Sequence, residues 1–481
     1  MLTDDQRYQA LLSKDPRFDG IFFVGVSSTG IYCRTICKAK SPHRKNCTFY
    51  PSAAAAERAG YRPCLLCRPE LAPGRAKTDA IGRLAAAAAN QIESGVLTQY
   101  SVSELANRLG ISDRHLRRVL QQEFGVSPIQ LAQTQRLLLA KRLLTDSHLS
   151  IADIAFASGF SSVRRLNTLF KDRYHLSPTA LRRKAAKTPQ GMTQDSLYCE
   201  LAYRPPFDWQ RLLSFLRQRA VTGVEVIDDD RYQRTVQIGP HRGWIAVSPA
   251  RSHNKLRVQI STSLIAVILP ILTRVKSLFD LGADPTLIAD CLGELMMPFA
   301  GIRVPGAFDG FEVSMRAILG QQVSVKAATT LMGRVVEAFG TPMSPSTGPS
   351  TGLNYLTPTS AQIAQASPEQ LASLGIIKRR ARSIIALAQA VENRELQLVP
   401  YSNTAVTIAQ LTALPGIGDW TAHYIALRVL AYPDAFPHGD LALRRALQID
   451  KPTDVLQAAE RWRPWRAYAA MCLWSSLEST P

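Results

Sequence analysis

The spacing of apolar residues changes along this chain of 481 residues, and each change predicts a different kind of structure. Residues 1 to about 75 mix aromatic and β-branched stretches such as DGIFFVGVSSTGIYC with turns, which favours a small α+β domain. From about 78 to 187, apolar residues recur every three or four positions, as in helices. Strand-like segments dominate from 197 to about 264, after a helix at WQRLLSFLRQRA, and the remainder is largely helical.

We expect four domains, at residues 1–76, 78–187, 195–300 and 301–481. The expected fold class is multidomain. It comprises a small α+β domain, an all-α domain, an α+β subdomain with an antiparallel sheet, and a second all-α domain. The basic stretch LRRKAAKTPQG should link the second domain to the third, and the Ser/Thr/Pro/Gly-rich stretch GTPMSPSTGPSTGLNYLTPTS should be a loop.

Charge distinguishes the two halves of the chain. Residues 1–187 hold 29 Lys and Arg against 14 Asp and Glu, so they carry +15 of the formal net charge of +19. Such a basic half favours an acidic partner, with nucleic acid as the leading candidate and a merely solubilising surface as the alternative. The N-terminus lacks the pattern of a secretory signal, and the longest apolar run, LIAVILPIL, is shorter than the ~18 residues of a membrane helix. We therefore expect a cytoplasmic protein without a membrane partner.

Five of the eight cysteines lie between Cys33 and Cys67. Cys33 and Cys37 form a CxxxC pair, and Cys64 and Cys67 form a CxxC pair about 30 residues later. Four thiolates in two short-spaced pairs suit one tetrahedral Zn²⁺, which a small domain needs for stability. Cys47 is expected to be a packed apolar residue rather than a ligand. The spacing alone leaves a purely structural zinc as the alternative.

The segments SSTGIYCRTIC and YRPCLLCRPE resemble the N-terminal domain of the Ada family, bacterial methyl phosphotriester repair proteins and transcription regulators. The resemblance covers residues 1 to about 75 and implies that zinc-bound Cys33 accepts a methyl group from a DNA phosphotriester. Methylation would remove one negative charge, reduce repulsion from DNA phosphates and so activate transcription, with RNA polymerase as a partner. The surrounding basic residues that would contact phosphates are Lys38, Lys40, Arg44, Lys45 and Arg62.

Two consecutive segments predict helix-turn-helix units: SVSELANRLGISDRHLRRVLQQEFG, with its turn at Gly110, and SIADIAFASGFSSVRRLNTLFKDRYHLSP, with its turn at Gly159. The predicted helix starts are Ser101, Ser112, Ser150 and Ser161. This tandem resembles the AraC-type DNA-binding domain. The residues expected to face the major groove and its phosphates are Arg114, His115, Arg117, Arg118, Arg164, Arg165 and Asn167. For each of them, an ordinary surface position is the alternative.

Near the C-terminus, LPGIGDWTAHYIALRVL predicts a hairpin whose glycines, Gly416 and Gly418, let backbone amides approach a DNA phosphate. In AFPHGDLALRR, Asp440 stands at the start of the next helix, where an isolated acid would only be a helix cap. Together the motifs resemble the helix-hairpin-helix glycosylase superfamily, in which this aspartate is catalytic. FEVSMRAILGQQVSV and RWRPWRAYAAMCLW narrow the resemblance to AlkA-type 3-methyladenine DNA glycosylases, over about 197–476.

The resemblance implies hydrolysis of the N-glycosidic bond of alkylated bases. Trp420, Tyr424 and Trp474 would stack on the flipped cationic base. Gln322 stands where AlkA has a leucine wedge. Trp420 replaces the lysine of bifunctional lyases, which implies a monofunctional enzyme, and only Cys472 remains where relatives carry the ligands of an iron–sulfur cluster, so none is expected.

The sequence therefore predicts a DNA repair protein that also regulates transcription in response to alkylation damage. No Pro-Cys-His-Arg motif is present, so direct reversal of O-methylguanine is not expected. One alternative is a purely regulatory sensor with an inactive glycosylase half. Another is a structural zinc adaptor without chemistry at either site.

Overall fold

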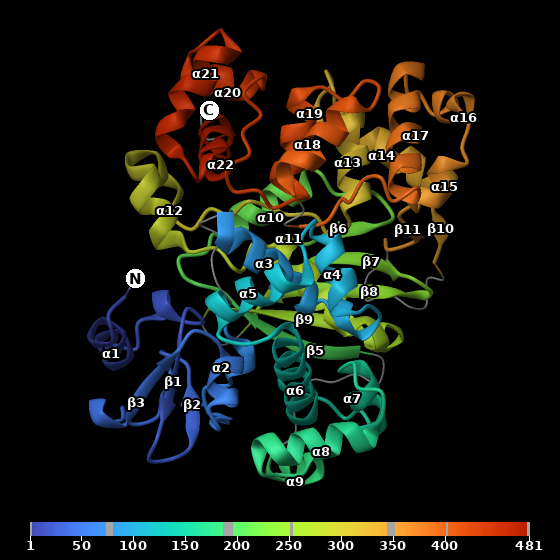
Figure 1. Ribbon diagram of the computed structural model, residues 1–481. Coiled ribbons are helices and arrows are strands. Elements are labelled where there is room, and N and C mark those ends of the chain that lie inside the picture. The colour runs from blue at the N-terminus through green and yellow to red at the C-terminus, as the bar shows by residue number, and fades with distance from the viewer. Residues whose placement is uncertain are drawn as a thin grey trace. The chain divides into compact units, whose positions relative to one another are not determined.

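A computed structural model of the chain describes residues 2–73, 80–185, 196–250, 254–343, 352–400 and 403–478 (Figure 1). Contacts divide it into a first unit, Met1–Pro205 with Ala250–Thr273 and Leu281–Asp284, and a second unit, Pro206–Pro249 with Arg274–Asp280 and Pro285–Pro481. The expected boundaries at 76, 78, 187 and 195 lie outside the described residues. None of the described helices is long and apolar enough to cross a membrane.

The first unit begins with a four-stranded sheet of order β3-β1-β2-β4. Its strands are β1 (Phe23–Val26), β2 (Ile31–Cys33), β3 (Cys47–Tyr50) and β4 (Arg62–Pro63), and its helices are α1 (Asp4–Leu12) and α2 (Ala53–Arg58). β1 runs antiparallel to β2 and β3, whereas β2 and β4 run parallel. The aromatic residues predicted for strands form the core, where Phe23 and Tyr32 pack edge to face at 5.9 Å.

Seven helices follow among the described residues of the first unit, as the apolar spacing predicts (Figure 1). They are α3 (Ala80–Glu93), α4 (Val102–Arg108), α5 (Asp113–Phe124), α6 (Pro128–Asp146), α7 (Ile151–Ala157), α8 (Val163–Tyr174) and α9 (Pro178–Ala185). Ser101, Ser112 and Ser150 cap α4, α5 and α7. The predicted start at Ser161 is wrong by one residue: Ser162 has the extended backbone of a cap, and its hydroxyl accepts the N–H of Arg165.

The helix-turn-helix units pack through their predicted faces. Ala106 and Ala155 are fully buried, so the helices approach each other closely there. Leu116, Val119, Leu120, Leu166 and Phe170 are also buried, while Leu169 is half-buried. The long helix α6 joins the two helix-turn-helix units and contributes a row of buried leucines.

The predicted strands are present. β5 (Ser196–Ala202) pairs antiparallel with β9 (Lys255–Ser261) in the first unit, where Arg142 of α6 donates a hydrogen bond to the carbonyl of Glu200 on β5. In the second unit β7 (Tyr232–Ile238) pairs antiparallel with β6 (Glu225–Ile227) and β8 (His241–Pro249). The predicted helix is α10 (Trp209–Arg217), and α11 (Ile268–Leu278) follows β9 along the chain.

The rest of the second unit is helical, in agreement with the predicted class. Its helices are α12 (Pro285–Leu292), α13 (Gly310–Leu319), α14 (Val325–Phe339), α15 (Ser360–Ala364), α16 (Pro368–Ser373), α17 (Lys378–Glu392), α18 (Thr404–Ala413), α19 (Asp419–Arg428), α20 (Leu441–Leu447), α21 (Pro452–Ala459) and α22 (Arg466–Glu478). The expected loop contains two short paired strands, β10 (Thr341–Pro342) and β11 (Tyr355–Leu356), so it is not wholly irregular. Residues 344–351 of that loop lie outside the described part of the chain.

Candidate functional site

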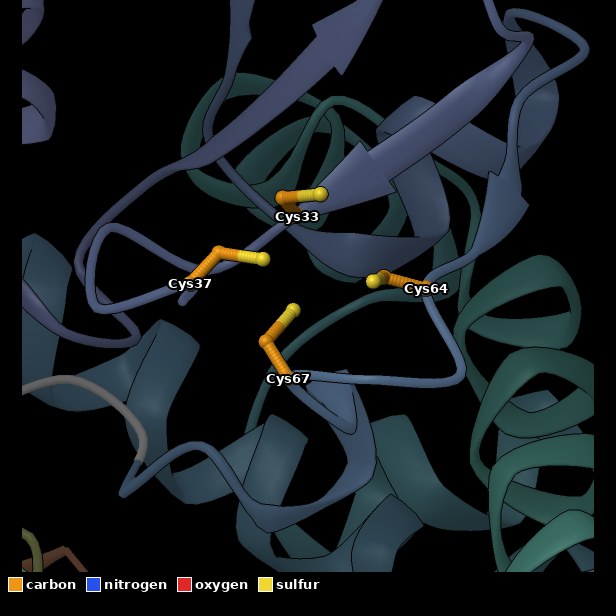
Figure 2. A group of neighbouring side chains, drawn as sticks. All are labelled: Cys33, Cys37, Cys64 and Cys67. Atoms are coloured by element: carbon orange, nitrogen blue, oxygen red, sulfur yellow. The ribbon is translucent and has the colours of Figure 1, made fainter. Parts of the chain in front are cut away.

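Four cysteines meet at one edge of the small sheet (Figure 2). Cys33 ends β2 and Cys64 directly follows β4, and because these strands are parallel neighbours, both cysteines leave the sheet at the same edge. Cys37 and Cys67 follow in the short turns beyond. The four sulfur atoms all lie within 4.8 Å of one another. The structure thus brings together the four predicted ligands.

This donor set fits zinc, because four sulfur ligands around one ion are typical of tetrahedral Zn²⁺ sites. Cys37 and Cys64 are buried, whereas Cys33 and Cys67 are half-buried. The cluster is therefore enclosed by the domain but still accessible at Cys33 and Cys67.

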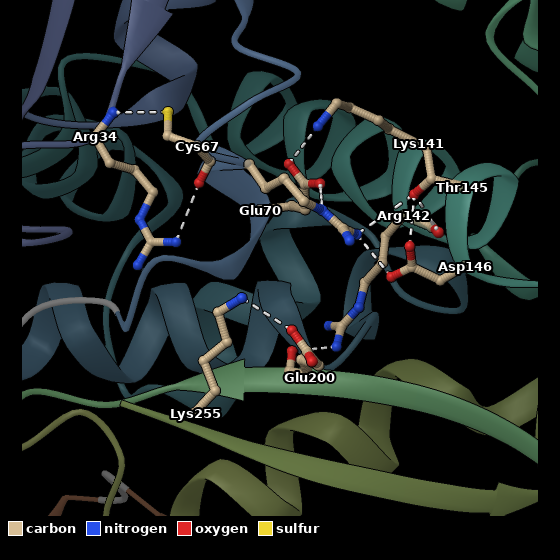
Figure 3. Close-up of polar contacts among 10 residues, drawn as sticks. Arg34, Cys67, Glu70, Lys141, Arg142, Thr145, Asp146, Glu200 and Lys255 are labelled. Carbon is tan, nitrogen blue, oxygen red and sulfur yellow. Dashed lines mark hydrogen bonds and ion pairs between the residues drawn. The ribbon is translucent and has the colours of Figure 1, made fainter. Parts of the chain in front are cut away.

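Arg34 holds the turn that carries Cys67 (Figure 3). Its backbone N–H donates to Cys67 Sγ at 3.4 Å, and its Nη1 donates to the Cys67 carbonyl at 3.2 Å. The same guanidinium forms a buried ion pair with Asp19. A single residue next to Cys33 thereby fixes the position of the second cysteine pair.

Cys47 lies apart from this cluster. It is buried in the apolar core with Val24 and Val26, and its thiol donates to the carbonyl of His43 at 3.4 Å. Burial raises the pKa of the Cys47 thiol above its ordinary value, which disfavours the thiolate form. These observations support its interpretation as a packed residue.

The basic residues around the cluster differ in their exposure. Lys38, Lys40 and Lys45 are exposed, and Arg62 is half-buried. Arg44 instead approaches Asp5 at 3.4 Å and lies over the ring of Phe49 at 5.4 Å. Its side chain therefore has a structural role in the domain.

A buried carboxyl that sequence reasoning missed ties this domain to the helix-turn-helix units. Glu57 of α2 accepts hydrogen bonds from the hydroxyls of Thr134 on α6 at 2.8 Å, Tyr32 at 3.0 Å and Tyr174 on α8 at 3.4 Å. Burial raises the pKa of Glu57 to about 7, although these hydrogen bonds act in the opposite direction. No local sequence signal marks the contact, because its partners are 77 and 117 residues away along the chain.

A second polar contact begins directly beside the cluster (Figure 3). Arg68 follows Cys67 and donates to Glu70 at 3.0 Å and to Asp146 of α6 at 2.6 Å. Lys141 of α6 pairs with Glu70 at 2.6 Å, and both side chains are only 2% exposed. Burial alone would raise the pKa of Glu70, but the charges of Lys141 and Arg68 lower it below its ordinary value. The turn of the second cysteine pair is therefore joined to α6.

The second helices of the two helix-turn-helix units present the predicted basic faces. Arg114, Arg117, Arg118, Arg164, Arg165 and Asn167 are exposed, and His115 is half-buried. Arg117 forms an ion pair with Asp113 one turn earlier, at 2.6 Å, so its guanidinium is partly engaged. Their contacts with DNA remain predictions.

In the second unit, four N–H groups hold the carboxylate of Asp440. Oδ1 accepts from the backbone of Ala442 at 2.9 Å and Leu443 at 3.1 Å, and from the indole of Trp474 at 3.1 Å. Oδ2 accepts from the indole of Trp420 at 2.9 Å. Donors on both oxygens fix the direction of the carboxylate. Asp440 therefore caps α20 and also directs a negative charge toward the aromatic residues.

The three predicted aromatic residues gather around this carboxylate. Trp420 and Tyr424, one turn apart on α19, stack with ring centroids 5.5 Å apart and an interplanar angle of 16°. Tyr424 and Trp474 lie 6.3 Å apart. All three side chains and Asp440 are half-buried, so the arrangement can accept a planar group beside an anion.

The predicted hairpin precedes α19. Gly416 has a φ of +76°, and a Cβ there would lie 2.3 Å from Ser383 Oγ of α17. Gly418 is the N-cap of α19 and leaves open space around its α-carbon. The backbone at Gly418 is thus open where an anion could approach its amides.

Gln322, at the position of the AlkA leucine wedge, lies in a turn that is hydrogen-bonded to this hairpin. Gln322 is exposed and has a φ of +55°, so the turn presents its side chain outward. Its neighbour Gln321, which sequence reasoning missed, donates to the carbonyl of Gly416 at 2.9 Å and to the hydroxyl of Thr421 at 3.0 Å. The turn and the hairpin are therefore held together.

The arrangement defines a class: a DNA repair protein that joins a cysteine centre and a regulatory DNA-binding domain to a base-excision fold. Four family models match successive parts of the chain: the metal binding domain of Ada at 6–70, a helix-turn-helix domain at 105–184, the AlkA N-terminal domain at 198–309, and the HhH-GPD superfamily of base excision DNA repair proteins at 315–463. The predicted fold class and the expected families are confirmed.

The chain is 37% identical to a "Probable bifunctional transcriptional activator/DNA repair enzyme AlkA" of Mycobacterium tuberculosis, over 98% of this chain and 96% of the relative. It therefore belongs to this family of bifunctional transcriptional activator/DNA repair enzymes. A DNA-3-methyladenine glycosylase 2 of Escherichia coli is 35% identical over 57% of this chain and 95% of its own length. The solved 3-methyladenine DNA-glycosylase of Archaeoglobus fulgidus shares the fold, with a TM-score of 0.51 and 20% identity over 58% of this chain and 99% of its own.

Proposed function

We propose that this protein excises alkylated bases of the 3-methyladenine type from DNA and, at a separate site, accepts methyl groups from DNA methyl phosphotriesters. The single observation that carries the first activity is the Asp440 carboxylate, held by the indoles of Trp420 and Trp474. Catalytic charge and aromatic pocket are thereby one rigid structure.

Excision needs little acid catalysis. A base alkylated at N3 or N7 is cationic, so when the glycosidic C1′–N bond breaks, the electron pair neutralises the departing base. The deoxyribose becomes oxocarbenium-like, and anionic Asp440 stabilises that charge. Water then adds to C1′ and its proton passes to solvent. Trp420, Tyr424 and Trp474 would hold the flipped base, while Gly416 and Gly418 bind a phosphate and Gln322 enters the duplex. The lysine required for lyase chemistry is replaced by Trp420.

Methyl acceptance takes place at Cys33, the half-buried sulfur at the end of β2. The residues that would hold one zinc are Cys33, Cys37, Cys64 and Cys67, and zinc, when bound, keeps the sulfurs as thiolates at neutral pH. The Cys33 sulfur forms a bond to the methyl carbon, the C–O bond breaks, and the phosphate leaves as an ordinary phosphodiester anion. The transfer is stoichiometric, because the resulting thioether is stable.

The regulatory activity follows from this change of charge. Loss of one negative charge favours DNA, which Lys40 and Arg62 would contact beside the cluster. The recognition residues of α5 and α8 would then hold a promoter operator and position the protein to recruit RNA polymerase, in the cytoplasm. These contacts would come from Arg114, Arg117, Arg118, Arg164 and Arg165.

One experiment tests both activities. The protein is incubated with duplex DNA treated with a methylating agent, and released bases and the mass of the protein are measured in the same sample. We expect release of 3-methyladenine, strongly slowed in Asp440→Asn, and one added methyl per chain, absent in Cys33→Ala. Methylation without base release would instead identify a purely regulatory sensor. If neither base release nor methylation is observed, the protein is a structural adaptor.

A further inference from the structure

A positively charged side chain lies behind the aromatic pocket. Arg428, at the end of α19, is 4% exposed. Its Nη1 donates to the hydroxyl of Tyr424 at 3.0 Å, its Nη2 donates to the carbonyl of Gly306 at 3.2 Å, and its Nε donates to the carbonyl of Pro305. The guanidinium also lies over the ring of Phe215 at 5.0 Å. Within the described parts of the chain its partners are neutral, and no carboxylate forms an ion pair with it.

Two further arginines act on the same hydroxyl. Burial alone would raise the pKa of Tyr424, yet the charges of Arg428, Arg219 and Arg316 lower it below its ordinary value. Arg316 itself uses its guanidinium on the Arg219 carbonyl and on the hydroxyl of Thr329 at 2.6 Å. The phenol end of the pocket therefore stands in a positive potential.

At the two indoles, in contrast, the electrostatic potential is negative. Trp420 and Trp474 both donate to the carboxylate of Asp440, whereas Tyr424 accepts from a guanidinium whose central carbon is 5.9 Å from its ring centroid. A cation stacked on Tyr424 would be attracted by the ring face but repelled by Arg428 behind it. A neutral base would stack on the ring without being repelled by Arg428. A base stacked on that ring would lie somewhat farther from the guanidinium, and at an effective dielectric constant of about 20 a charge in that range changes affinity by roughly tenfold to a hundredfold.

We propose that Arg428 is a specificity-determining residue, whose charge lowers the preference of the pocket for cationic alkylated bases relative to neutral modified purines. The proposal rests on the proposed function, because it requires Tyr424 to line the base pocket. Arg428 acts through Tyr424 and touches no reacting atom, so its role is to set the balance between two classes of substrate.

The test compares two substrates in one enzyme preparation. Single-turnover excision is measured on duplex oligonucleotides that contain either 7-methylguanine, which is cationic, or hypoxanthine, which is neutral. Arg428→Met removes the charge at similar volume, and Arg428→Lys is the matched control that keeps it. We expect the ratio of cationic to neutral excision to rise roughly tenfold or more in Arg428→Met and to stay within about threefold of wild type in Arg428→Lys.

A general loss of packing would slow both substrates and leave their ratio unchanged, which would overturn the proposal, as would a fall in the ratio. Should Arg428→Met fail to fold, as seen in its thermal melt, the same ratio is read in Arg316→Met. That variant removes a second positive charge without touching the Tyr424 hydroxyl, and an unchanged ratio there would also refute the role of this potential. A wild-type protein that excises neither base would refute the proposed function itself, so the two failures are distinguishable.

Discussion

The hydroxyl of Thr134, on the helix that joins the two DNA-reading units, donates a 2.8 Å hydrogen bond to the buried carboxyl of Glu57, which belongs to the domain of the cysteine cluster. Glu57 and Glu70 are the two buried acids of this contact, and each has partners on α6. Because unpaired buried polar groups are costly, such contacts are specific in geometry. The cysteine domain is therefore fixed on α6 in a defined orientation.

This contact predicts a pH-dependent stability of the first unit. The folded-state pKa of Glu57, about 7, lies above its ordinary value of 4.5. The folded protein thus binds this proton more tightly than the unfolded chain does. The stabilisation is complete below about pH 4.5 and is lost as the pH rises through about 7, a change of roughly 3 kcal/mol.

Glu57→Gln keeps the shape without the titration, so it should flatten the dependence of chemical denaturation on pH between about 5 and 8. Glu337→Gln, at an exposed glutamate of the second unit, is the control and should leave this pH dependence unchanged. A wild-type unit that grows more stable over this range would contradict the prediction.

Removal of one ligand should unfold the N-terminal domain. Cys64→Ala leaves three sulfurs, and metal binding supplies most of the folding free energy of such small domains. We expect elemental analysis to find one zinc per wild-type chain and none in the variant, with loss of secondary structure by circular dichroism. Cys47→Ala is the matched control and should retain its zinc. Zinc-free protein with this domain folded would show that the metal is dispensable.

Cys33 should carry the methyl group after reaction with methylated DNA. It is the more accessible member of the first pair, since Cys37 is buried. Peptide mass mapping should place one added methyl on Cys33, and the methylated protein should bind promoter-like DNA more tightly, with the gain shrinking as salt is added. A methyl on Cys47, or unchanged affinity, would refute this scheme.

Asp440→Asn should lower the rate of base excision by ~10²–10³, since preorganised charge contributes a few kcal/mol. The amide retains an oxygen for Ala442, Leu443 and Trp474, but its NH₂ group would face the Trp420 indole N–H, which also donates. DNA binding and methyl acceptance by Cys33 should persist.

Single-turnover excision of 3-methyladenine measures this effect. Trp420→Phe keeps the carboxylate but loses the facing donor, so it separates the effect of the charge from that of the hydrogen bond. Excision by Asp440→Asn within about tenfold of wild type, a loss of only ~1.4 kcal/mol, would reduce Asp440 to a helix cap.

Local patterns predicted much of the fold and of the candidate site. The cysteine spacing identified the ligand set, because two short turns at one sheet edge need only a few residues each. Adjacent serines, however, made the start of α8 ambiguous, and only the backbone shows that Ser162 is the cap. Glu57 and Gln321 act through partners distant in the sequence, so no periodicity or motif could identify their roles. Arg428 lies one helical turn from Tyr424, but the carbonyls of Pro305 and Gly306 that hold its guanidinium are 123 and 122 residues away.

The length of α6 has a consequence for the kind of operator that this protein can read. Its 19 residues span ~28 Å, a little less than the ~34 Å of one turn of B-DNA. Both helix-turn-helix units lie on one chain and differ in sequence, so we expect one molecule to contact neighbouring major grooves without a symmetry mate. We therefore expect a non-palindromic operator, whose inversion in a promoter abolishes activation.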